Sequence, residues 1–433
     1  MTRELLARFG GNLNLLASIP TKRKLLAEDG GFGFAEGVQM KLVVFAQTPP
    51  PLHGQSYMVD LLVRGLAEND LGIEVFHVNA QFATSADDIG KFRIGKVFRL
   101  FGYCFKAMAF RFREGARALY YVPSPPVRNP LYRDWLILLL LRPFFRNVIF
   151  HWHAAGLGEW IEKQPAFMRK VSQLALGRAE VSISLGRFNE KDAAIFRPRK
   201  SLIVANGIPD PCPNFAELQA ARRVRLQPRV ALWETPDALP KHATIVVRVL
   251  FMSLCSKEKG LFDAIEGVCQ ANRLCRADHL PMEFELTIAG AFPDAATEEF
   301  YRQTLVRLGN PATIRHIGFA DGDTKAKLLA ESDIFCFPTF YYGENLSLVL
   351  LEAMATGLPI LVTKWRSLPD ILPANYPGLV DIQSPDQVAE ALFHLALRDD
   401  TDEFRKIFLN NYTAEKFLVN MAEAIRSAEQ SAT

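Results

Sequence analysis

Short runs of β-branched and aromatic residues recur along the sequence, and stretches with a helical pattern separate them. This alternation is typical of a parallel sheet with helices on both faces, and it restricts the chain to the α/β class. A proline-rich region divides the runs into two series. The predicted strands are residues 41–46, 73–78, 118–122, 148–152, 181–184 and 201–204 in the first series, and 245–252, 283–289, 313–316, 334–337, 360–363 and 378–380 in the second.

The 433 residues are too many for one ordinary hydrophobic core and enough for two. We therefore predict two doubly wound, Rossmann-like domains with the ligand site in a deep cleft between them, because such folds bind ligands beyond the carboxyl ends of their strands. Residues 1–39 show little strand pattern, so Met1 and Met40 are both candidate starts. The predicted parts are an extension (1–39), a first domain (40–208), a linker with an insertion (209–243), a second domain (244–410) and a C-terminal helix that packs back on the first domain (411–433).

Composition excludes several classes of protein. A hydrophobic content of 49% and a charged content of 22% are typical of a globular protein. The net charge of +3 gives no basis for nucleic-acid binding. Six cysteines without CxxC pairs favour reduced, buried thiols and a cytoplasmic protein. No signal peptide is evident, and the longest apolar run, 135–145, is too short to span a bilayer.

Two glutamates eight positions apart, Glu344 and Glu352, lie in the most informative segment, residues 340–363. A loop runs into an apolar helical stretch that ends at Gly357, and a β-type run follows. The N-terminus of such a helix suits a nucleotide diphosphate, and carboxylates accept hydrogen bonds from sugar and ribose hydroxyls. One carboxylate would lie at the mouth of the site and the other about two turns down the helix. An amphipathic helix with one solvated glutamate explains the spacing equally well.

Three further segments follow predicted strands. Gly54 allows close approach of the backbone to a ligand, although a proline-rich turn explains its loop as well. His151 and His153 share one strand face and suit a hydroxyl or a phosphate; no nearby partner supports zinc, and a structural role is as plausible. Lys259 with Gly260 would clamp a diphosphate, whereas most loop lysines are simply solvated.

A basic amphipathic helix is predicted over residues 91–113, which contain no acidic residue. Such a helix binds an anionic membrane surface or an acidic partner, or else packs its apolar side on its own sheet. The predicted apolar side carries Ile94, Val97, Phe98, Phe101, Phe105, Met108 and Phe112, and the predicted basic side carries Arg93, Lys96, Arg99, Lys106 and Arg113.

With these segments in this order, residues 40–430 resemble the retaining glycosyltransferases of family 4, which have the GT-B fold. The resemblance implies an enzyme that moves a sugar, of hexosyl type, from a nucleotide-diphosphate sugar to a sugar or lipid-linked hydroxyl acceptor. It further implies polysaccharide, lipopolysaccharide or glycolipid synthesis without metal or another cofactor, at the inner face of the cell membrane. The matching segments are the Gly54 loop, HWHAAG at 151–156, ANGIP at 205–209, KEKG at 257–260, HIG at 316–318, ESDIFCFPT at 331–339 and the segment of the two glutamates.

The resemblance also implies residue roles in the second domain. Glu352 would hold the ribose, and Glu344 would lie near the transferred sugar. The backbone amides of Asn345 and Leu346 would face the sugar and the distal phosphate. Lys259 would clamp the diphosphate.

In the first domain, His153 would reach the sugar and Gly54 would lie beneath the phosphates. Lys259, Glu344 and His153 are thus the predicted catalytic residues, and no metal ligand is predicted.

The sequence departs from the family pattern at two places. Many members have an arginine where this chain has Leu254, which removes one cation, and Arg248 or Lys257 are candidate replacements. A common glycine pair is replaced by residues 365–367, where Arg366 is a candidate donor-binding residue. Because this cation is missing, a degenerate, non-catalytic subunit that binds a sugar nucleotide is an alternative function. A GT-B sugar-nucleotide epimerase is a further alternative, against which the paired glutamates argue.

Overall fold

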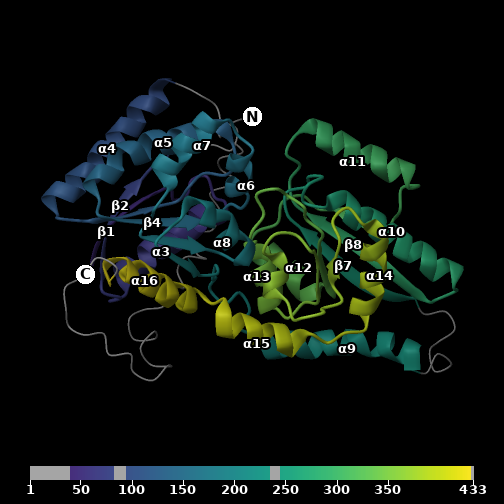
Figure 1. The fold of residues 1–433 in the computed structure, drawn as a ribbon. Helices are drawn as coiled ribbons and strands as arrows, with labels where there is room; N and C mark the ends of the chain where they lie inside the picture. Colours follow the sequence, from purple (N-terminus) through teal and green to yellow (C-terminus); the bar gives the residue numbers. More distant parts are fainter. Residues whose placement is uncertain (1–39, 82–93, 235–243, 431–433) are drawn as a thin grey trace. The chain divides into compact units, whose positions relative to one another are not determined.

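The computed structural model describes residues 40–81, 94–234 and 244–430 (Figure 1). These residues form two compact units. Unit 1 extends to Pro209 and resumes at Asn411, and unit 2 comprises Asp210–Asn410. Each unit contains a parallel sheet of six strands, which confirms the predicted α/β class and the doubly wound architecture. The predicted extension, residues 1–39, lies outside the described residues.

In unit 1, the strand order is β2-β1-β3-β4-β5-β6, and each neighbouring pair is parallel. The predicted strands of the first series are confirmed to within a residue at either end. The elements are β1 (Met40–Ala46), α3 (Gly54–Glu68), β2 (Ile73–Asn79), α4 (Ile94–Arg113), β3 (Ala118–Tyr121), α5 (Arg128–Leu141), η3 (Arg142–Phe144), β4 (Asn147–Trp152), α6 (Leu157–Glu162), α7 (Ala166–Leu176), β5 (Val181–Ser184), α8 (Arg187–Ala193), η4 (Ala194–Phe196), β6 (Lys200–Ile203) and α16 (Ala414–Gln430).

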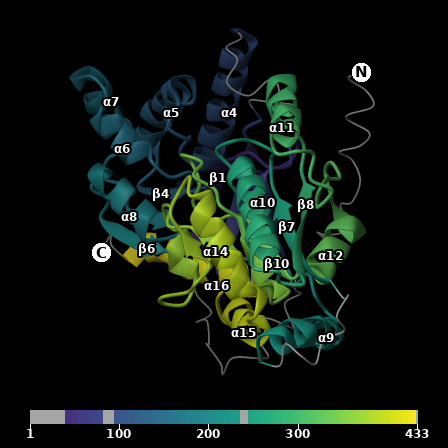
Figure 2. The same ribbon diagram turned by 90° about the vertical axis from the view of Figure 1, so that its right-hand side faces the viewer.

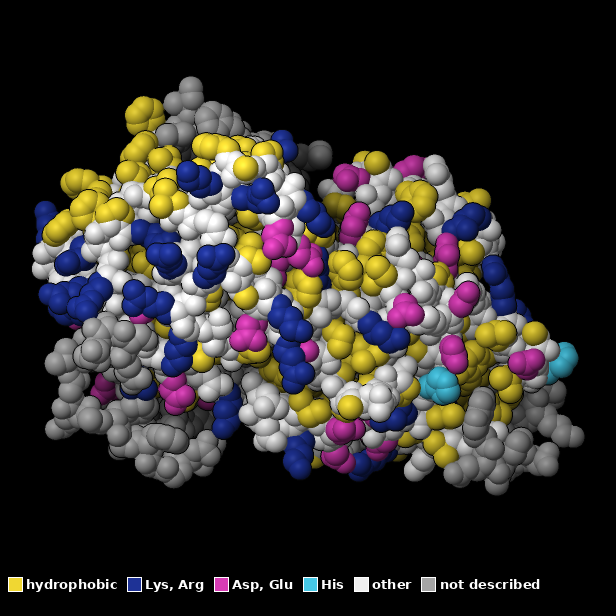
Figure 3. Space-filling model, viewed as in Figure 1, with side chains coloured by type: hydrophobic (Ala, Val, Ile, Leu, Met, Phe, Trp, Pro, Cys, Tyr) yellow, Lys and Arg dark blue, Asp and Glu magenta, His cyan; other side chains and the backbone are white. Residues whose placement is uncertain are grey.

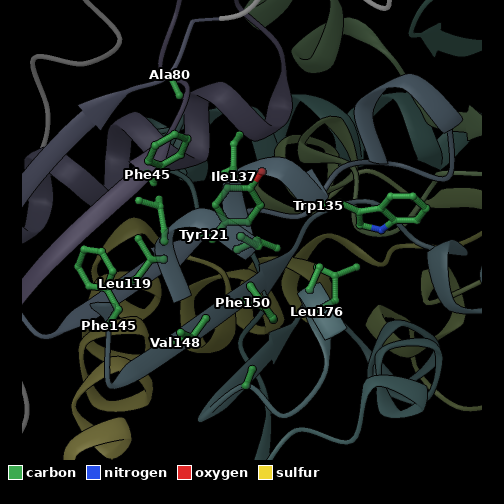
Figure 4. Close-up of a cluster of buried hydrophobic side chains, with 14 of the residues drawn as sticks. Phe45, Ala80, Leu119, Tyr121, Trp135, Ile137, Phe145, Val148, Phe150 and Leu176 are labelled. Atoms are coloured by element: carbon green, nitrogen blue, oxygen red, sulfur yellow. The ribbon is translucent and has the colours of Figure 1, made fainter. Parts of the chain in front are cut away.

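One hydrophobic core of unit 1 lies between the sheet and helices α4, α5 and α7. Alternate strand residues such as Phe45, Tyr121 and Phe150 point toward Trp135 of α5 and Leu176 of α7 (Figure 4). These side chains are between 0% and 9% exposed. Because strand side chains alternate between faces, the intervening residues are left to pack on the opposite face of the sheet.

The C-terminal helix α16 packs against α3, β4 and β5 of unit 1. At Gly65 of α3, a Cβ atom would lie 2.3 Å from a methyl carbon of Leu418, so any larger residue there would require the Leu418 side chain to shift. The chain enters α16 through two backbone hydrogen bonds of 2.9 Å, from Ile208 N to Tyr412 O and from Ala414 N to Ile208 O.

Unit 2 has the strand order β12-β11-β10-β7-β8-β9, again with parallel pairs. Helices α10 and α14 lie side by side on one face of this sheet (Figure 2). The elements are α9 (Phe215–Glu234), β7 (Ile245–Met252), α10 (Leu261–Ala277), β8 (Met282–Ala289), α11 (Ala295–Arg307), β9 (Ile314–His316), α12 (Gly322–Glu331), β10 (Ile334–Phe337), α13 (Leu348–Ala355), β11 (Ile360–Thr363), η6 (Leu368–Ile371), β12 (Leu379–Val380), α14 (Pro385–Ala396) and α15 (Thr401–Asn411).

The region expected as a linker with an insertion, 209–243, contains helix α9, which belongs to unit 2. Arg225 Nε and Arg229 Nη2 lie 3.0 and 3.3 Å from Oδ1 of the buried Asp333. Arg222 donates hydrogen bonds to the carbonyls of Leu329 and Thr356. Arg222, Arg225 and Arg229 of α9 are therefore structural, and local sequence could not reveal this because their partners lie more than a hundred positions away.

The structure of helix α4 contradicts the interpretation that its apolar side packs on its own sheet. The expected packing of its phenylalanines on the sheet is wrong: Phe98 is 74% exposed, and Phe101, Phe105 and Phe112 are 46%, 72% and 65% exposed. The helix packs instead through smaller residues, Leu100, Cys104 and Ala107, which are at most 4% exposed. Residues 91–93 of the predicted helix lie outside the described residues.

All six cysteines are buried and unpaired, as their spacing predicted. No helix among the described residues is long and apolar enough to cross a membrane.

Candidate functional site

The topology of unit 2 brings two loops together at one edge of its sheet. Strands β7 and β10 are neighbours, but the chain leaves β7 toward β8 and β9 and leaves β10 toward β11 and β12. Such a reversal is where doubly wound sheets bind ligands, beyond the carboxyl ends of the strands. The loop after β7 carries Lys259, and the loop after β10 carries Glu344.

Lys259 and Glu344 form an ion pair across these two loops. Lys259 Nζ lies 2.6 Å from Glu344 Oε2, and the two side chains are only 17% and 7% exposed. The Thr339 hydroxyl donates to the same carboxylate oxygen at 3.2 Å, and the ammonium lies 4.7 Å from the ring centroid of Tyr341. Removing two charges from water is costly unless each is paired, so this pair holds both side chains in place at the sheet edge.

Glycine 260 fixes the contact between the two loops. Its φ is +80°, and a Cβ atom there would lie 2.1 Å from the carbonyl oxygen of Pro338. Phe340 N donates to Glu258 O at 2.8 Å from the other side. The glycine of the KEKG segment therefore allows the Lys259 loop to lie directly on the Glu344 loop.

Asn345 has a buried side-chain amide without an internal partner. The residue is 2% exposed, and neither Oδ1 nor Nδ2 has a hydrogen-bond partner among the residues that the structure describes. Buried polar groups are rarely left unpaired in folded proteins, so this amide marks a position where a ligand would supply the partner. Asn345 and Leu346 precede α13, at the helix end that carries a partial positive charge.

Glu352 lies in the second turn of α13, whereas Glu344 lies in the loop before the helix. Lys325 of α12 places its Nζ 2.5 Å from Glu352 Oε1, and the glutamate side chain is 16% exposed. Each of the two predicted donor-binding carboxylates is thus paired with one lysine. The spacing of the glutamates places one before the helix and one on it, which agrees with the two positions expected from the sequence.

The position of the missing cation is exposed: Leu254 is 48% exposed in the loop after β7. Lys257 is exposed in the same loop. Arg248 lies four residues before the end of β7, about 13 Å from the loop at 3.3 Å per residue. Its backbone amide binds Asp333 Oδ2 at 3.0 Å, so it belongs to a different part of the unit and is not a replacement cation.

Arg366 follows β11 and stacks on two aromatic rings. Its guanidinium carbon lies 4.6 Å from the ring centroid of Tyr342 and 4.8 Å from that of Trp365. Trp365 Nε1 donates to Tyr341 O at 2.8 Å, which ties this loop to the Glu344 loop. Arg366 has a φ of +54°, a conformation that favours glycine, at a place where the family pattern has a glycine pair. The arginine therefore retains the glycine-type backbone and adds a cation beside the site loops.

Unit 1 has its own reversal, between β1 and β3. Gly54 is the first residue of α3, directly after the loop that follows β1. His53 caps this helix: its Nδ1 accepts from Ser56 N at 3.3 Å, and its own N–H donates to Ser56 Oγ at 3.0 Å. Burial lowers the pKa of His53.

His151 and His153 are uncharged at neutral pH. Burial lowers the pKa of His153 to about 3, with a smaller effect from His53, and burial lowers the pKa of His151 well below its usual value. The His151 Nδ1 and the Tyr120 hydroxyl share a hydrogen bond of 2.6 Å, and the two imidazole rings lie 4.2 Å apart. Neither Nε2 atom has a partner within the described part of the chain. This edge of unit 1 thus offers neutral hydrogen-bonding groups.

Within unit 2 the structure brings together Lys259 and Glu344, as the predicted site requires, and it places Gly54 and His153 in unit 1. Sequence reasoning missed Thr339, Lys325 and the side chain of Asn345. Thr339 had a weak signal, because it directly follows a strand in the matching segment; Lys325 had none, because it comes from a separate helix. No cluster of three or more histidine, cysteine or acidic residues suited to a metal ion occurs in the described ranges.

Comparison with known proteins gives a family match for part of the second half of the chain. Residues 247–398 match the family model for glycosyl transferases group 1. The amylovoran biosynthesis glycosyltransferase AmsK of Erwinia amylovora is 27% identical over 194 residues, covering 43% of this chain and 42% of that protein. A sulfoquinovosyl transferase of Arabidopsis thaliana is 36% identical over 80 residues, covering 18% of this chain and 15% of that protein. The chain therefore spans less than half the length of these relatives.

Solved structures extend the comparison to the fold of the whole chain. The Anabaena protein HepE in complex with UDP aligns with a TM-score of 0.61 and 14% identity, covering 90% of this chain and all of that one. At this identity the likeness concerns the fold alone. Residues 247–398 thus match the model for glycosyl transferases group 1, and the chain as a whole has the GT-B fold.

Proposed function

We propose that the chain is a retaining glycosyltransferase that moves a sugar from a nucleotide-diphosphate sugar to a hydroxyl acceptor. The observation that carries this proposal is the buried Lys259–Glu344 pair, at the edge of the sheet where the strand order reverses. A cation and a carboxylate there, with the unmet amide of Asn345, suit a ligand that combines phosphates with hydroxyls. The complex of HepE with UDP, a protein of the same fold, supports a nucleotide donor.

The proposed chemistry follows from these groups. The bond between the anomeric carbon and the diphosphate oxygen breaks, the acceptor oxygen bonds to the same face of the sugar, and the acceptor proton passes to the departing diphosphate. Negative charge grows on the diphosphate, where Lys259 and the backbone amides of Asn345 and Leu346 stabilise it. The lysine supplies the cation, so we propose a reaction without a metal ion.

Glu344 and Glu352 act in this proposal as hydroxyl acceptors, for the transferred sugar and the ribose respectively. Each glutamate has a lysine nitrogen within 2.6 Å of a carboxylate oxygen. This pairing suits a carboxylate that accepts hydrogen bonds, and it suits a general acid less well. A glycosidase-like division into acid and nucleophile does not fit two separately paired carboxylates.

For unit 1 we retain the roles that the family resemblance implies. Gly54 lies beneath the donor phosphates, and His153 binds a hydroxyl of the transferred sugar. The neutral state of His153 suits this role, because a neutral imidazole both donates and accepts hydrogen bonds. Arg366 is the further donor-binding residue, at the rim of the Glu344 loop.

We place the reaction in polysaccharide, lipopolysaccharide or glycolipid synthesis, with a sugar or lipid-linked sugar as acceptor, in the cytoplasm at the inner face of the cell membrane. Relatives named for amylovoran biosynthesis and for O-antigen chain mannosyl transfer support this class of acceptor.

A second candidate function is a sugar-nucleotide-binding subunit without catalysis. The exposed, uncharged side chain of Leu254 favours it, because one cation of the usual family pattern is absent beside the diphosphate position.

The first experiment identifies the donor by thermal stabilisation with UDP-, GDP- and ADP-sugars, since a ligand that binds only the folded protein raises its melting temperature. The stabilising donor is then tested for hydrolysis and for transfer, with Lys259→Ala, Glu344→Ala and Glu352→Ala as variants. We expect turnover by the unmodified protein and a loss of turnover in the variants. Donor binding by all of these proteins, with no turnover on any acceptor or on water, would favour the binding subunit instead.

A further inference from the structure

Three phenylalanine–cation pairs repeat along the exposed side of α4. Phe98, Phe105 and Phe112 recur every seven residues, and each is followed at once by a basic residue, Arg99, Lys106 or Arg113. Seven residues make nearly two helical turns, so the phenylalanines form one row and the cations a neighbouring row, about 100° further round the helix. The phenylalanines are between 65% and 74% exposed, and the three cations are exposed as well.

The apolar row continues onto the neighbouring helices of unit 1. Phe112 makes an edge contact with Phe144 of η3, with ring centroids 5.8 Å apart. Figure 3 shows hydrophobic side chains gathered over the region of α4, α5 and α7, with lysine and arginine side chains beside them. We call this surface the docking face; its exposed apolar residues are Phe98, Phe101, Phe105, Phe112, Tyr132, Leu136, Leu139, Phe144, Phe167 and Leu174.

The docking face is positively charged. Helices α4 and α7 contain no acidic residue, and α5 contains only Asp134, which is fully buried and paired with Arg133 at 3.0 Å. Exposed basic residues on the three helices include Arg99, Lys106, Arg113, Arg128, Arg169 and Lys170. The whole chain, these helices included, has a net charge of only +3, so this concentration of cations is local.

The inner sides of the same helices are already fully used. Leu100, Cys104 and Ala107 of α4 pack into the core together with Leu138 of α5 and Leu176 of α7. The exposed phenylalanines therefore cannot be buried by turning a helix, because that would expose residues that are now at most 4% exposed. Large exposed apolar patches are uncommon on soluble monomers and mark surfaces that bind something.

We infer that the docking face binds the surface of an anionic phospholipid membrane. Aromatic side chains enter the boundary between headgroups and acyl chains, and flanking lysine and arginine side chains pair with anionic headgroups. The complementary charge selects an anionic partner. The apolar surface extends over three helices, and none of these helices has an exposed acidic residue. Such a broad surface fits a flat lipid surface. This inference does not depend on the donor or on the reaction.

The test uses the full chain and sedimentation with large vesicles. One set contains about one part phosphatidylglycerol to three parts phosphatidylcholine, and the other contains phosphatidylcholine alone. We expect binding to the anionic vesicles, and at least about tenfold weaker binding to the neutral ones. Binding to the anionic vesicles should weaken as the salt concentration rises, because exposed charges are screened at high ionic strength.

Two variants test the aromatic and the basic residues of the docking face separately. Phe98→Ser with Phe105→Ser removes the two most exposed rings of α4 and should weaken binding by roughly tenfold or more. Arg99→Gln, Lys106→Gln and Arg113→Gln together should weaken it by roughly a hundredfold. The matched controls lie in unit 2: Phe300→Ser with Val306→Ser, which are 51% and 66% exposed, and Arg273→Gln with Arg276→Gln and Lys406→Gln, which are exposed cations. Both controls should bind as the unmodified chain does.

The outcome separates this inference from the proposed enzymatic function. Thermal stabilisation by the donor should be unchanged in the docking-face variants, since none of these residues belongs to the proposed site. If the phenylalanine variant and its control bind anionic vesicles equally, the inference is wrong. Concentration-dependent dimers that the phenylalanine variant abolishes, without vesicle binding by the unmodified chain, would show instead that the face joins two copies of the protein.

Discussion

The candidate site residues at the edges of the two sheets differ in charge. In unit 2, the edge beyond β7 and β10 holds charges in pairs, Lys259 with Glu344 and Lys325 with Glu352. In unit 1, the edge beyond β1 and β4 holds histidines that burial keeps neutral. The residues that we place in the candidate site are therefore charged in unit 2 and neutral in unit 1. Under the proposed function, unit 2 handles the phosphate charge and unit 1 recognises hydroxyls.

The largest test of this difference removes the cation from the charged edge. Lys259→Ala should lower donor turnover by about 10²–10³-fold, because the growing charge of the leaving diphosphate loses its partner. The measurement is the initial rate of donor consumption at saturating donor. Lys327→Ala, at a lysine of α12 whose side chain is 72% exposed, should stay within about twofold of the unmodified rate. Equal losses in both variants would remove the special role of Lys259.

The second test concerns how the charged edge is built. Gly260→Ala should destabilise the protein by about 3 kcal/mol, since it combines a positive φ with a clash against the carbonyl of Pro338. Gly309 has a φ of +82° but nothing within 4 Å of an added Cβ, so Gly309→Ala should cost only about 1 kcal/mol. Urea denaturation of both variants measures the difference. Equal costs would mean that the contact between the two loops contributes nothing.

The third test separates the two glutamates. Glu352→Gln should weaken binding of the free nucleoside diphosphate and of the donor alike, by roughly tenfold, because it acts on the shared ribose. Glu344→Gln should weaken binding of the donor and leave the free nucleotide nearly unchanged, because it acts on the sugar. Calorimetric titration with the nucleotide and the donor gives all four affinities. A uniform loss in both variants would contradict the assignment of separate hydroxyls.

The fourth test concerns the buried histidines of unit 1. Because burial lowers the pKa of His153 to about 3, the unfolded chain binds more protons than the folded one between that value and about pH 6.5. The stability contribution is therefore complete above about pH 6.5 and declines as the pH falls, by about 1.4 kcal/mol per pH unit for this histidine.

Urea denaturation at several pH values between about 5 and 7 measures that slope. His153→Gln should flatten it relative to the unmodified chain. His394→Gln is the control, because the His394 side chain is 62% exposed and can stay hydrated in either state. A slope unchanged by His153→Gln would show that this imidazole is not held neutral by the fold.

Local patterns in the sequence predicted the strands and the order of the loops well. The strand runs are rich in β-branched and aromatic residues, and each is bounded by turn-forming residues, so every predicted strand appears in its sheet. The family resemblance predicted Lys259 and Glu344 in one site, and the carboxyl ends of the two parallel strands do meet at one edge.

Features that depend on distant partners could not be predicted. Lys325 pairs with a glutamate on a different helix, and nothing around it signals that role. In α4, the hydrophobic pattern indicated a packed side, yet the sheet accepts only the row of smaller residues around Cys104, and the phenylalanines lie outside it.

Helix α9 changes where unit 2 can be cut. Its guanidinium groups are the partners of the Asp333 carboxylate, which is 3% exposed and lies directly before strand β10. A fragment that begins at β7 would leave the buried Asp333 carboxylate without its arginine partners. A fragment that begins at Asp210 would keep them. Any attempt to express unit 2 alone should therefore begin before the helix, within the region that the sequence pattern predicted as a linker with an insertion.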